Sequence, residues 1–296
     1  MSDGLNTTGK RYAYVFYATN DTHAVAVLVF VHLLREHGIR DDADVVVLHL
    51  PLSRYLLARM RGMGLITRLV SALRYVRGRY FRDCLVKLRI FELTGYERII
   101  YVDADSIPLK SLDPLFFLRL DGPLAAPRAY WCTQPYWGTH LLVVKPSALL
   151  WNRAQRRFGS AAAKRYFDMD IVNVEFGERE IQTLPAEIVC LDSEWEDTRR
   201  PGFFGDPGET FSRVSVIHFS ALDKPWSLSA RRVRRLRPNA DAIFYQLRDT
   251  WWRARDEIFR DSPLRVRMRY AALKLLCQRV KPRYVRDRLA QWTRRG

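Results

Sequence analysis

Two short apolar runs limit how this 296-residue chain can fold. Asp44-Val-Val-Val-Leu-His-Leu50 and Arg98-Ile-Ile-Tyr-Val-Asp103 are apolar at consecutive positions instead of at every second one. Strands with this pattern are covered by protein on both faces, as in a parallel sheet that lies between helices. We therefore predict an α/β fold with a mostly parallel sheet flanked by helices.

The segments around these runs fit that fold. Residues 11–18 alternate and are rich in aromatic side chains, which predicts a strand. Thr19-Asn20-Asp21-Thr22 can cap a helix, and the apolar run 24–34 predicts that helix, with an end near Gly38. The order strand, helix, strand favours parallel pairing. We also predict helices at 53–82 (with a loop around Gly62 and Gly64), at 84–93, from Pro146-Ser147 onward and at 168–182, and strands at 141–144 and 214–218.

The positive charge is concentrated at one end of the chain. The net charge is +17, and residues 227–296 hold 20 Lys and Arg against 6 Asp and Glu, a balance of +14. Residues 1–226 therefore carry only +3 by difference. We predict an α/β catalytic domain over 1–226 and a basic helical extension over 227–296. Such an extension suits an anionic membrane surface or a nucleic acid.

The last part of the extension has the pattern of an amphipathic helix. Ser262-Pro263 is a good helix start, and apolar residues recur at helical spacing after it, with Arg and Lys between them. We predict that 260–296 lies on anionic lipid, and a helix packed on the catalytic domain stays an equal alternative. Nucleic acid is disfavoured as a partner because no nucleic-acid motif accompanies the charge.

The spacing of the cysteines and the length of the longest apolar run indicate the cellular compartment of the protein. Cys84, Cys132, Cys190 and Cys277 lie far apart without metal-ligand spacing, which predicts free thiols in a reducing compartment. The first residues are polar and show no secretory signal. The apolar run 24–34 is shorter than the roughly 20 residues that a membrane span needs. We predict a cytoplasmic protein without a transmembrane helix, peripheral to a membrane if the extension binds lipid.

Two carboxylates follow the apolar run that ends at Asp103. Asp103 and Asp105 flank Ala104, and in open α/β sheets ligands bind beyond the carboxyl ends of the strands. Carboxylate oxygens suit Mn²⁺ or Mg²⁺, and such an ion offsets the charge of a pyrophosphate leaving group. The position predicts a metal site for a nucleotide-sugar donor, with a solvated turn as the alternative.

A second enzyme class has a similar pair of acids. Phosphatases of the haloacid dehalogenase type carry Asp-x-Asp after a buried strand, with the first Asp as nucleophile. Their motif lies near the start of the domain and usually precedes Gly-Thr or Gly-Val. Here it lies at 103–105 and precedes Ser106-Ile107, which disfavours the phosphatase.

Another metal-competent side chain ends the predicted strand 214–218. His218 occupies that end, although a single histidine there is more often structural. Lys224-Pro225-Trp226 follows, and Lys224 can neutralise a phosphate oxygen as a point charge.

Together these residues resemble glycosyltransferase family 8, which includes glycogenin-like and bacterial lipopolysaccharide glycosyltransferases. The resemblance spans about residues 12–226, and His-Phe-x4-Lys-Pro-Trp is its most specific motif. The matching blocks, in the order of the family, are Thr19-Asn20-Asp21, Lys87-Leu88 before Tyr101-Val-Asp103-Ala-Asp105, Asp168-Met-Asp170-Ile-Val-Asn173, and His218-Phe219 with Lys224-Pro225-Trp226.

The resemblance implies a GT-A fold, which is Rossmann-like, and a retaining hexosyltransferase that uses a UDP-sugar donor and Mn²⁺. It implies metal ligands at Asp103, Asp105 and His218. It implies donor binding by Tyr17, Thr19, Asn20, Lys87, Ala104 and Lys224. Asp168 and Lys87 would serve catalysis, with Asp168 facing the acceptor or the donor sugar. The acceptor would be a hydroxyl of a glycan, a lipid-linked molecule or a protein.

Several assignments have simpler alternatives. Tyr17 could only pack, Lys87 could be a surface residue, and Asp168 could cap a helix. The chain also departs from the family at Gly138-Thr139-His140, where many members have Asn-Ser-Gly or Asn-Ala-Gly, and at Met169, where many have Gln. These departures leave the sugar open. A non-catalytic protein that keeps a nucleotide-sugar fold and binds membranes or polyanions is the alternative function.

Overall fold

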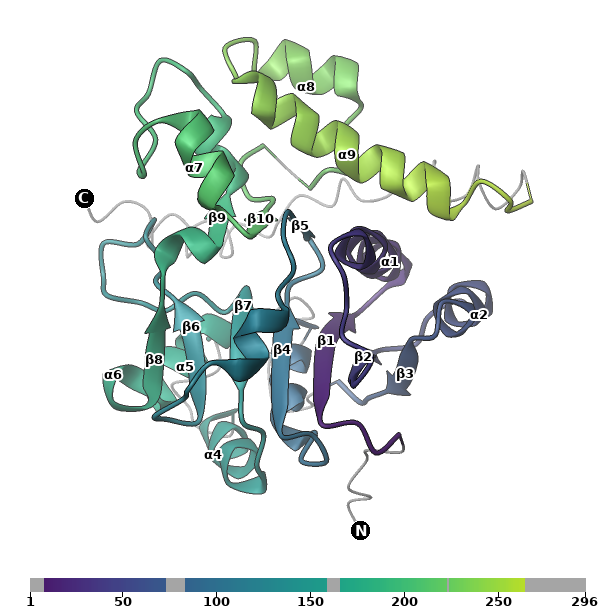
Figure 1. Ribbon diagram of the computed structural model, residues 1–296, viewed down its shortest axis with the longest axis vertical. Helices are drawn as coiled ribbons and strands as arrows, with labels where there is room; N and C mark the ends of the chain where they lie inside the picture. The colour runs from purple at the N-terminus through teal and green to yellow at the C-terminus, as the bar shows by residue number, and fades with distance from the viewer. Residues whose placement is uncertain (1–7, 73–82, 159–165, 223, 264–296) are drawn as a thin grey trace.

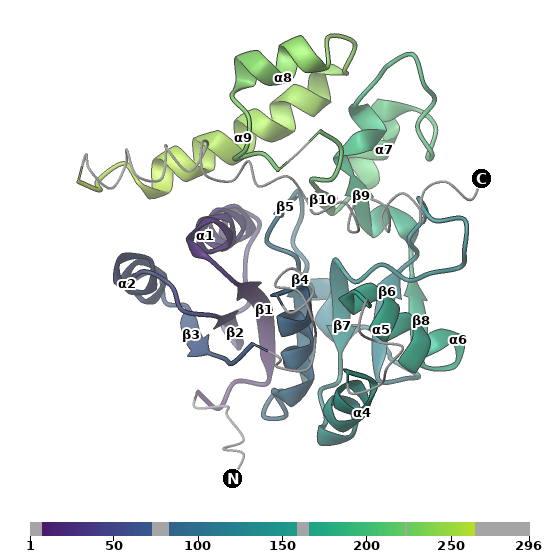
Figure 2. The same ribbon diagram turned by 180° about the vertical axis from the view of Figure 1, so that it is seen from behind.

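The computed structural model describes residues 8–72, 83–158, 166–222 and 224–263. Within these residues, a seven-stranded sheet lies between helices and a three-stranded sheet lies beside it (Figure 1). The small sheet and the last helices gather at one end of the molecule, which is also visible from behind (Figure 2). The predicted α/β class is confirmed.

The central sheet is mostly parallel. Its strands are β1 (Tyr12–Ala18), β2 (Ala43–His49), β3 (Ile66–Leu69), β4 (Arg98–Val102), β6 (Leu124–Pro127), β7 (Leu141–Val144) and β8 (Ile181–Leu184). They follow the order β3-β2-β1-β4-β7-β6-β8. β7 is antiparallel to both of its neighbours, β4 and β6, and the other pairs are parallel.

Both faces of this sheet are buried, and alternate residues of β1 enter two different cores. Tyr14 and Phe16 pack with residues of helix α1 (Asp21–Glu36). Ala13 and Val15 pack in the other core, with residues of η1 (Val86–Glu92), α4 (Ala148–Phe158) and α5 (Asp168–Glu175). Because side chains alternate across a strand, two covered faces explain the uninterrupted apolar runs of the sequence.

Helix α1 begins and ends where the sequence places its signals. The Asn20 side chain accepts a hydrogen bond from the His23 N–H at 3.0 Å and caps the first turn. Gly38 follows the helix with φ of +91°, a left-handed conformation that glycine adopts without steric cost. The helix predicted from the apolar run 24–34 is therefore confirmed, and its N-terminus lies at the carboxyl end of β1.

The small sheet joins distant parts of the chain. Its strands are β5 (Ser106–Pro108), β9 (Val189–Leu191) and β10 (Val216–His218), in the order β5-β10-β9. β10 is antiparallel to β5 and parallel to β9, and His218 lies opposite Ser106. Since β5 follows Asp105 directly, this pairing brings the end of β10 to the two carboxylates after β4.

The residues after Trp226 continue the same core. Helices α8 (Ala230–Leu236) and α9 (Ala242–Ile258) follow, and α9 packs along α1. The buried Trp251 of α9 contacts Trp226, with ring centroids 5.6 Å apart. The division at residue 226 stays a prediction, and the predicted tail helix lies almost wholly outside the described residues. No helix in the described part of the chain is both long and apolar enough to cross a membrane.

Short helices complete the described structure. They are α2 (Arg54–Gly62), η2 (Asp113–Phe117), α6 (Gly177–Glu180), η4 (Ala186–Ile188), η5 (Asp192–Trp195) and α7 (Pro207–Arg213).

Three helix predictions need correction. Residues 66–69 of the predicted helix 53–82 form strand β3, because pairing with β2 supplies their backbone hydrogen bonds; part of that range, 73–82, lies outside the described residues. The segment 86–92 is helical but has 3-10 geometry. The predicted helix 168–182 breaks at Gly177, where φ is +53°, and its last residues pair with β6 as strand β8. β5, β6 and β9 were not predicted.

Candidate active site

Asp103, Asp105 and His218 converge at the carboxyl end of β4. One potential ligand atom from each residue lies within 4.8 Å of the others. The backbone fixes their positions, because the Asp103 N–H donates to the His140 carbonyl and the Phe219 N–H donates to the Asp105 carbonyl, at 2.9 and 3.0 Å. Two carboxylates and an imidazole in this arrangement can hold a divalent cation.

His218 reaches this group through the pairing of β5 with β10. Its Nδ1 lies 3.2 Å from Ser106 Oγ and 3.5 Å from Asp105 Oδ1. Ser106 is completely buried, so the serine and the strand pairing together hold the imidazole beside the carboxylate. Residues 112 apart in the sequence are thereby held in contact.

Two lysines flank the carboxylates. Lys87 Nζ lies 2.9 Å from Asp103 Oδ1 and 2.8 Å from Asp168 Oδ2. Lys224 Nζ lies 2.6 Å from Asp105 Oδ2. Lys87 is 3% exposed, so the alternative that it is a surface residue is wrong. The site therefore presents two cations next to the carboxylates, which suits a ligand that carries phosphate groups.

Burial and these charges shift the titration of the site. Burial raises the pKa of Asp103 to about 6, although Lys87 opposes the shift. Burial also acts to raise the pKa of Asp105, but Lys224 and His218 outweigh it and leave that pKa below its ordinary value. Burial lowers the pKa of His218 to about 4. At neutral pH the imidazole is therefore uncharged and keeps a lone pair for a metal ion.

Lys87 stays charged in spite of its burial. Burial lowers the pKa of Lys87, but the attraction of Asp103 and Asp168 is larger and raises that pKa above its ordinary value. A buried ammonium held by two carboxylates is fixed in position, because moving it would leave buried charges without a partner.

The residues predicted to bind the nucleotide lie at the adjacent strand end. β1 and β4 are parallel neighbours, so their carboxyl ends meet at one edge of the sheet. Tyr17 stacks on Tyr101 with ring centroids 6.2 Å apart, and Lys87 Nζ lies 5.8 Å from the centroid of the Tyr17 ring. The structure thus brings Tyr17 to this site. The Tyr17 ring also packs against the core, so packing, which was the simpler alternative for this residue, is observed as well.

Thr19 and Asn20 form the turn between β1 and α1. Thr19 is buried and its Oγ1 lies 3.0 Å from His23 Nδ1. Asn20 is exposed and caps α1, as described above. Ala104 is buried between the two carboxylates. Contact of these three residues with a nucleotide stays a prediction.

Asp168 is buried at the first turn of α5 and is not its N-cap. That position belongs to Phe167, whose N–H donates to the Asp170 side chain at 2.9 Å. The Asp168 carboxylate instead accepts a hydrogen bond from Thr139 Oγ1 and forms the ion pair with Lys87. The arrangement connects Asp168 to Asp103 through one shared lysine.

Several residues of the site were not predicted. Tyr101 donates a hydrogen bond to Asp103, and His23 lies between Tyr17 and Trp226, with ring centroids 6.2 and 6.3 Å away. Both are on apolar elements; Tyr101 belongs to a block that matches family 8, but no role was assigned to it, and His23 carries no distinct sequence signal. Thr139 belongs to the segment in which the chain departs from family 8, so that departure was a usable signal.

The departing segment packs tightly against the metal-ligand group. The His140 ring lies 5.5 Å from the His218 ring and 5.1 Å from the Trp131 ring, between centroids. A Cβ atom at Gly138 would lie 2.2 Å from His140 Cε1, so glycine there makes room for the histidine ring. Gly138 and His140 are therefore a matched pair.

Known proteins with similar sequences include a glucose N-acetyltransferase and a glycogenin. Glucose N-acetyltransferase 1 of Aspergillus fumigatus is 27% identical over 258 residues, which cover 76% of this chain and 67% of that protein. Human glycogenin-2 is 28% identical over 245 residues, which cover 77% of this chain and 45% of that protein. The chain thus spans between 45% and 67% of the length of these relatives. No protein-family model matches the chain.

Solved structures agree on the fold. The apo structure of the bifunctional glycosyltransferase WbbM has a TM-score of 0.61 at 15% identity, with 90% of this chain and 53% of that one covered. The galactosyltransferase LgtC, in complex with donor and acceptor sugar analogues, has a TM-score of 0.54 at 18% identity, with 80% and 99% covered. The chain is similar in sequence to glycogenin-2 and shares the fold of these solved glycosyltransferases.

The resemblance to family 8, the GT-A fold and the assignment as a sugar-transferring enzyme are confirmed at that level. The roles of the individual site residues remain predictions drawn from their positions.

Proposed function

We propose that the protein transfers a hexose from a UDP-sugar to an acceptor hydroxyl with retention of configuration, and that it depends on Mn²⁺ or Mg²⁺. One observation carries the proposal. Asp103, Asp105 and His218 come from two sheets, and their ligand atoms gather within 4.8 Å at the carboxyl end of a central strand. Ligands of open α/β sheets bind at that edge.

The donor set fits the proposed ion. Two carboxylates and a neutral imidazole are ligands that Mn²⁺ accepts, and open positions would remain for phosphate oxygens. When bound, such an ion offsets the charge that develops on the departing diphosphate.

The two lysines would hold the diphosphate. Lys224 lies 2.6 Å from Asp105 and belongs to the turn after β10, so a short movement of its flexible side chain would reach a phosphate bound beside Asp105. Lys87 is fixed by Asp103 and Asp168 and would hold both carboxylates in place while adding positive charge to the site. Charged groups that are already oriented need little reorganisation during the reaction.

The uridine would bind at the end of β1. Tyr17 offers an aromatic ring beside Lys87, and Thr19 and Asn20 offer polar groups at the N-terminus of α1. Helix N-termini attract anions, so this edge also suits the phosphate groups.

Asp168 is the residue that we assign to the sugar and the acceptor. It is buried, and Thr139 and Lys87 orient its carboxylate. Asp170, the nearest other acid in the sequence, instead accepts the Phe167 N–H at the start of α5. Asp168 would therefore position the reacting groups while UDP leaves from the same face that the acceptor attacks.

The acceptor would be a hydroxyl group of a glycan, a glycolipid or a protein. If it is lipid-linked, the basic residues 260–296 would place the enzyme on an anionic membrane surface. Co-sedimentation with anionic vesicles tests this: the full chain should bind and a chain that ends at residue 259 should not. Equal binding of both chains would contradict a membrane role for 260–296.

Replacing Asp105 by Asn tests the proposed metal site. Metal-assisted charge stabilisation contributes several kcal/mol, so Mn²⁺-dependent release of UDP from a UDP-sugar should fall about 100-fold or more. UDP-glucose, UDP-galactose, UDP-N-acetylglucosamine and UDP-glucuronate would be compared as donors. The exposed Asp121, replaced by Asn, is a matched control that should keep full activity.

Three results would contradict the proposed function or its metal site. Full activity of Asp105→Asn would remove the metal site from the proposal. Binding of donor without any transfer or UDP release by the unaltered chain would favour the non-catalytic alternative. Hydrolysis of a simple phosphomonoester in preference to a UDP-sugar would favour the phosphatase.

A further inference from the structure

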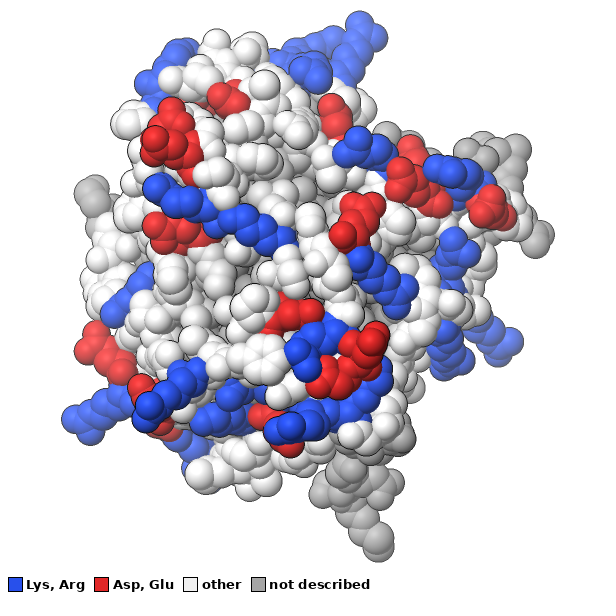
Figure 3. Space-filling model, in the orientation of Figure 1, with Lys and Arg blue, Asp and Glu red and all other residues white. Residues whose placement is uncertain are grey.

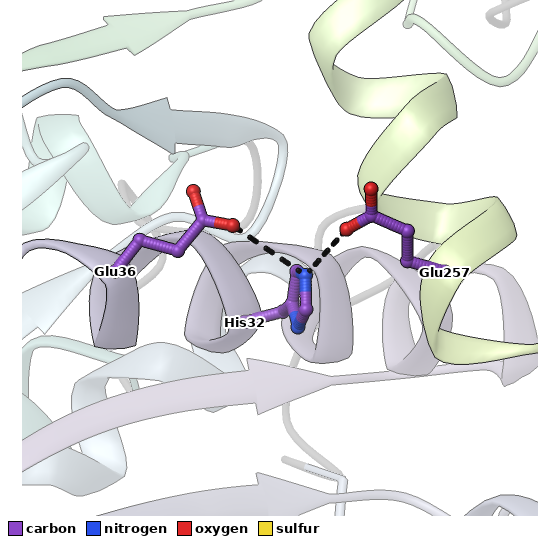
Figure 4. A group of neighbouring side chains, drawn as sticks. All are labelled: His32, Glu36 and Glu257. Carbon is purple, nitrogen blue, oxygen red and sulfur yellow. Dashed lines mark hydrogen bonds and ion pairs between the residues drawn. The ribbon is translucent and has the colours of Figure 1, made fainter.

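A second group of metal-binding side chains lies between helices α1 and α9. His32 and Glu36 are one turn apart on α1, and Glu257 belongs to the last turn of α9 (Figure 4). His32 Nε2 lies 3.0 Å from Glu257 Oε2 and 3.7 Å from Glu36 Oε1. One ligand atom from each residue lies within 4.8 Å of the other two.

The spacing of these atoms suits a small tetrahedral ion. Zinc binds histidine nitrogen at about 2.0–2.1 Å and carboxylate oxygen at about 2.0–2.2 Å, so neighbouring ligand atoms in a tetrahedron lie roughly 3.4 Å apart. The two distances from His32 Nε2, 3.0 and 3.7 Å, lie on either side of that value. Small rotations of the two glutamate side chains would be enough to complete the geometry.

The charges also favour a cation. One imidazole nitrogen faces two carboxylates, and a single N–H can donate to only one of them at hydrogen-bond distance; the 3.7 Å contact with Glu36 is too long. In the described part of the chain, no Lys or Arg forms an ion pair with Glu36 or Glu257. A divalent ion would balance both carboxylates and would accept the lone pair of a neutral His32.

The group is accessible and separate from the candidate active site. The side chains of His32, Glu36 and Glu257 are 30%, 56% and 37% exposed, so an ion can enter and water can fill a fourth position. His32 is twelve residues after Asn20, which corresponds to about 18 Å along a helix. An ion here would not touch the donor that we place at the other end of α1.

We propose that His32, Glu36 and Glu257 form a zinc site that joins α9 to α1. Neighbouring contacts act at the same place: Arg59 donates to the Ile258 carbonyl, and Tyr55 Oη lies 2.6 Å from Ser262 Oγ. The ion therefore stabilises the end of α9, directly before the basic segment 260–296.

The test measures zinc alone, in a background that removes the other site. Asp105→Asn disables the candidate active-site group, so this variant should bind one equivalent of Zn²⁺ by titration calorimetry and melt at a higher temperature with zinc. Adding His32→Gln or Glu257→Gln should weaken zinc binding at least about tenfold. Loss of a residue that only hydrogen-bonds to a metal ligand already weakens metal binding by that factor, and loss of the ligand itself should weaken it at least as much. The rise in melting temperature should disappear as well.

Controls separate this site from general effects. Glu36→Gln, at the third proposed ligand, should also weaken zinc binding, and because this side chain is 56% exposed its melting temperature without zinc should equal that of the background variant. The exposed Glu178→Gln is the matched control and should bind zinc as the background variant does. Equal zinc affinity and equal stabilisation in the His32→Gln and Glu178→Gln variants would overturn the proposal.

The outcome is independent of the proposed function. His32→Gln alone should keep the Mn²⁺-dependent release of UDP, since its contacts lie outside the candidate active site. Loss of transfer in Asp105→Asn with zinc binding retained would support both proposals, and zinc binding without any transfer activity in the unaltered chain would sustain only this one.

Discussion

At the residue scale, Asp192 organises the turn that carries Lys224. Its Oδ1 accepts hydrogen bonds from the Ser220 and Ala221 N–H groups at 2.7 and 2.8 Å, and its Oδ2 pairs with Arg248 at 2.8 Å. Asp192 is completely buried and Arg248 is 4% exposed. This buried pair ties the end of β10 to α9, so it supports the candidate active site without facing it.

Replacing Asp192 by Asn should lower the free energy of unfolding by about 3–5 kcal/mol, because it leaves the Arg248 charge buried without its carboxylate. Urea denaturation measures the loss. The exposed Asp121→Asn variant should stay close to the unaltered chain. A loss below that range in Asp192→Asn would show that the other contacts of Arg248 compensate for the missing carboxylate charge.

At the scale of elements, α9 belongs to the core formed by α1 and β1. Trp251 is 1% exposed, and its core includes Tyr14 of β1 and Leu28 of α1. Trp226 joins the same cluster from the end of the motif that carries Lys224. The basic composition after residue 226 therefore does not coincide with a break in packing, because the shared core continues as far as Phe259.

Trp251→Ala should cost about 3–5 kcal/mol, the usual cost of removing a large buried aromatic side chain. Because the tryptophan lies in a shared core, thermal unfolding should remain a single transition at a lower temperature. Leu149→Ala, at an exposed position of α4, is the control and should change the melting temperature little. Separate melting of α8 and α9 from the rest would contradict a shared core.

At the scale of the molecule, the candidate metal site joins two sheets. Asp103 and Asp105 flank the passage from β4 to β5, and His218 ends β10 of the small sheet. An ion bound by all three would link the sheets. Acidic and basic side chains are interspersed over the described part of the face in Figure 3.

Mn²⁺ should therefore stabilise the folded chain. At a free concentration 100-fold above the dissociation constant, a ligand that binds only the folded state contributes about 2.7 kcal/mol. Differential scanning calorimetry should show that Mn²⁺ raises the melting temperature of the unaltered chain and of His32→Gln. It should show no such rise for Asp105→Asn. A rise that persists in Asp105→Asn would place the stabilising ion elsewhere.

The sequence by itself determined the elements whose signals are local. Continuous apolar runs gave the buried strands β2 and β4, Asn20 and Gly38 bounded α1, and the carboxylates after β4 indicated a metal site. The predictions of these strands and of α1 succeeded because burial on both faces and helix capping depend on residues that are neighbours in the chain. The metal site stays a prediction.

Tertiary structure decided what depends on distant partners. β3 and β8 became strands because the open edges of β2 and β6 offered backbone partners to segments whose composition favoured helix. The sequence motifs named His218 as a ligand, but only the pairing of β5 with β10 brought it to Asp105. The meeting of Glu257 with His32 likewise depends on how α9 packs on α1, because helix packing joins residues that no sequence spacing relates.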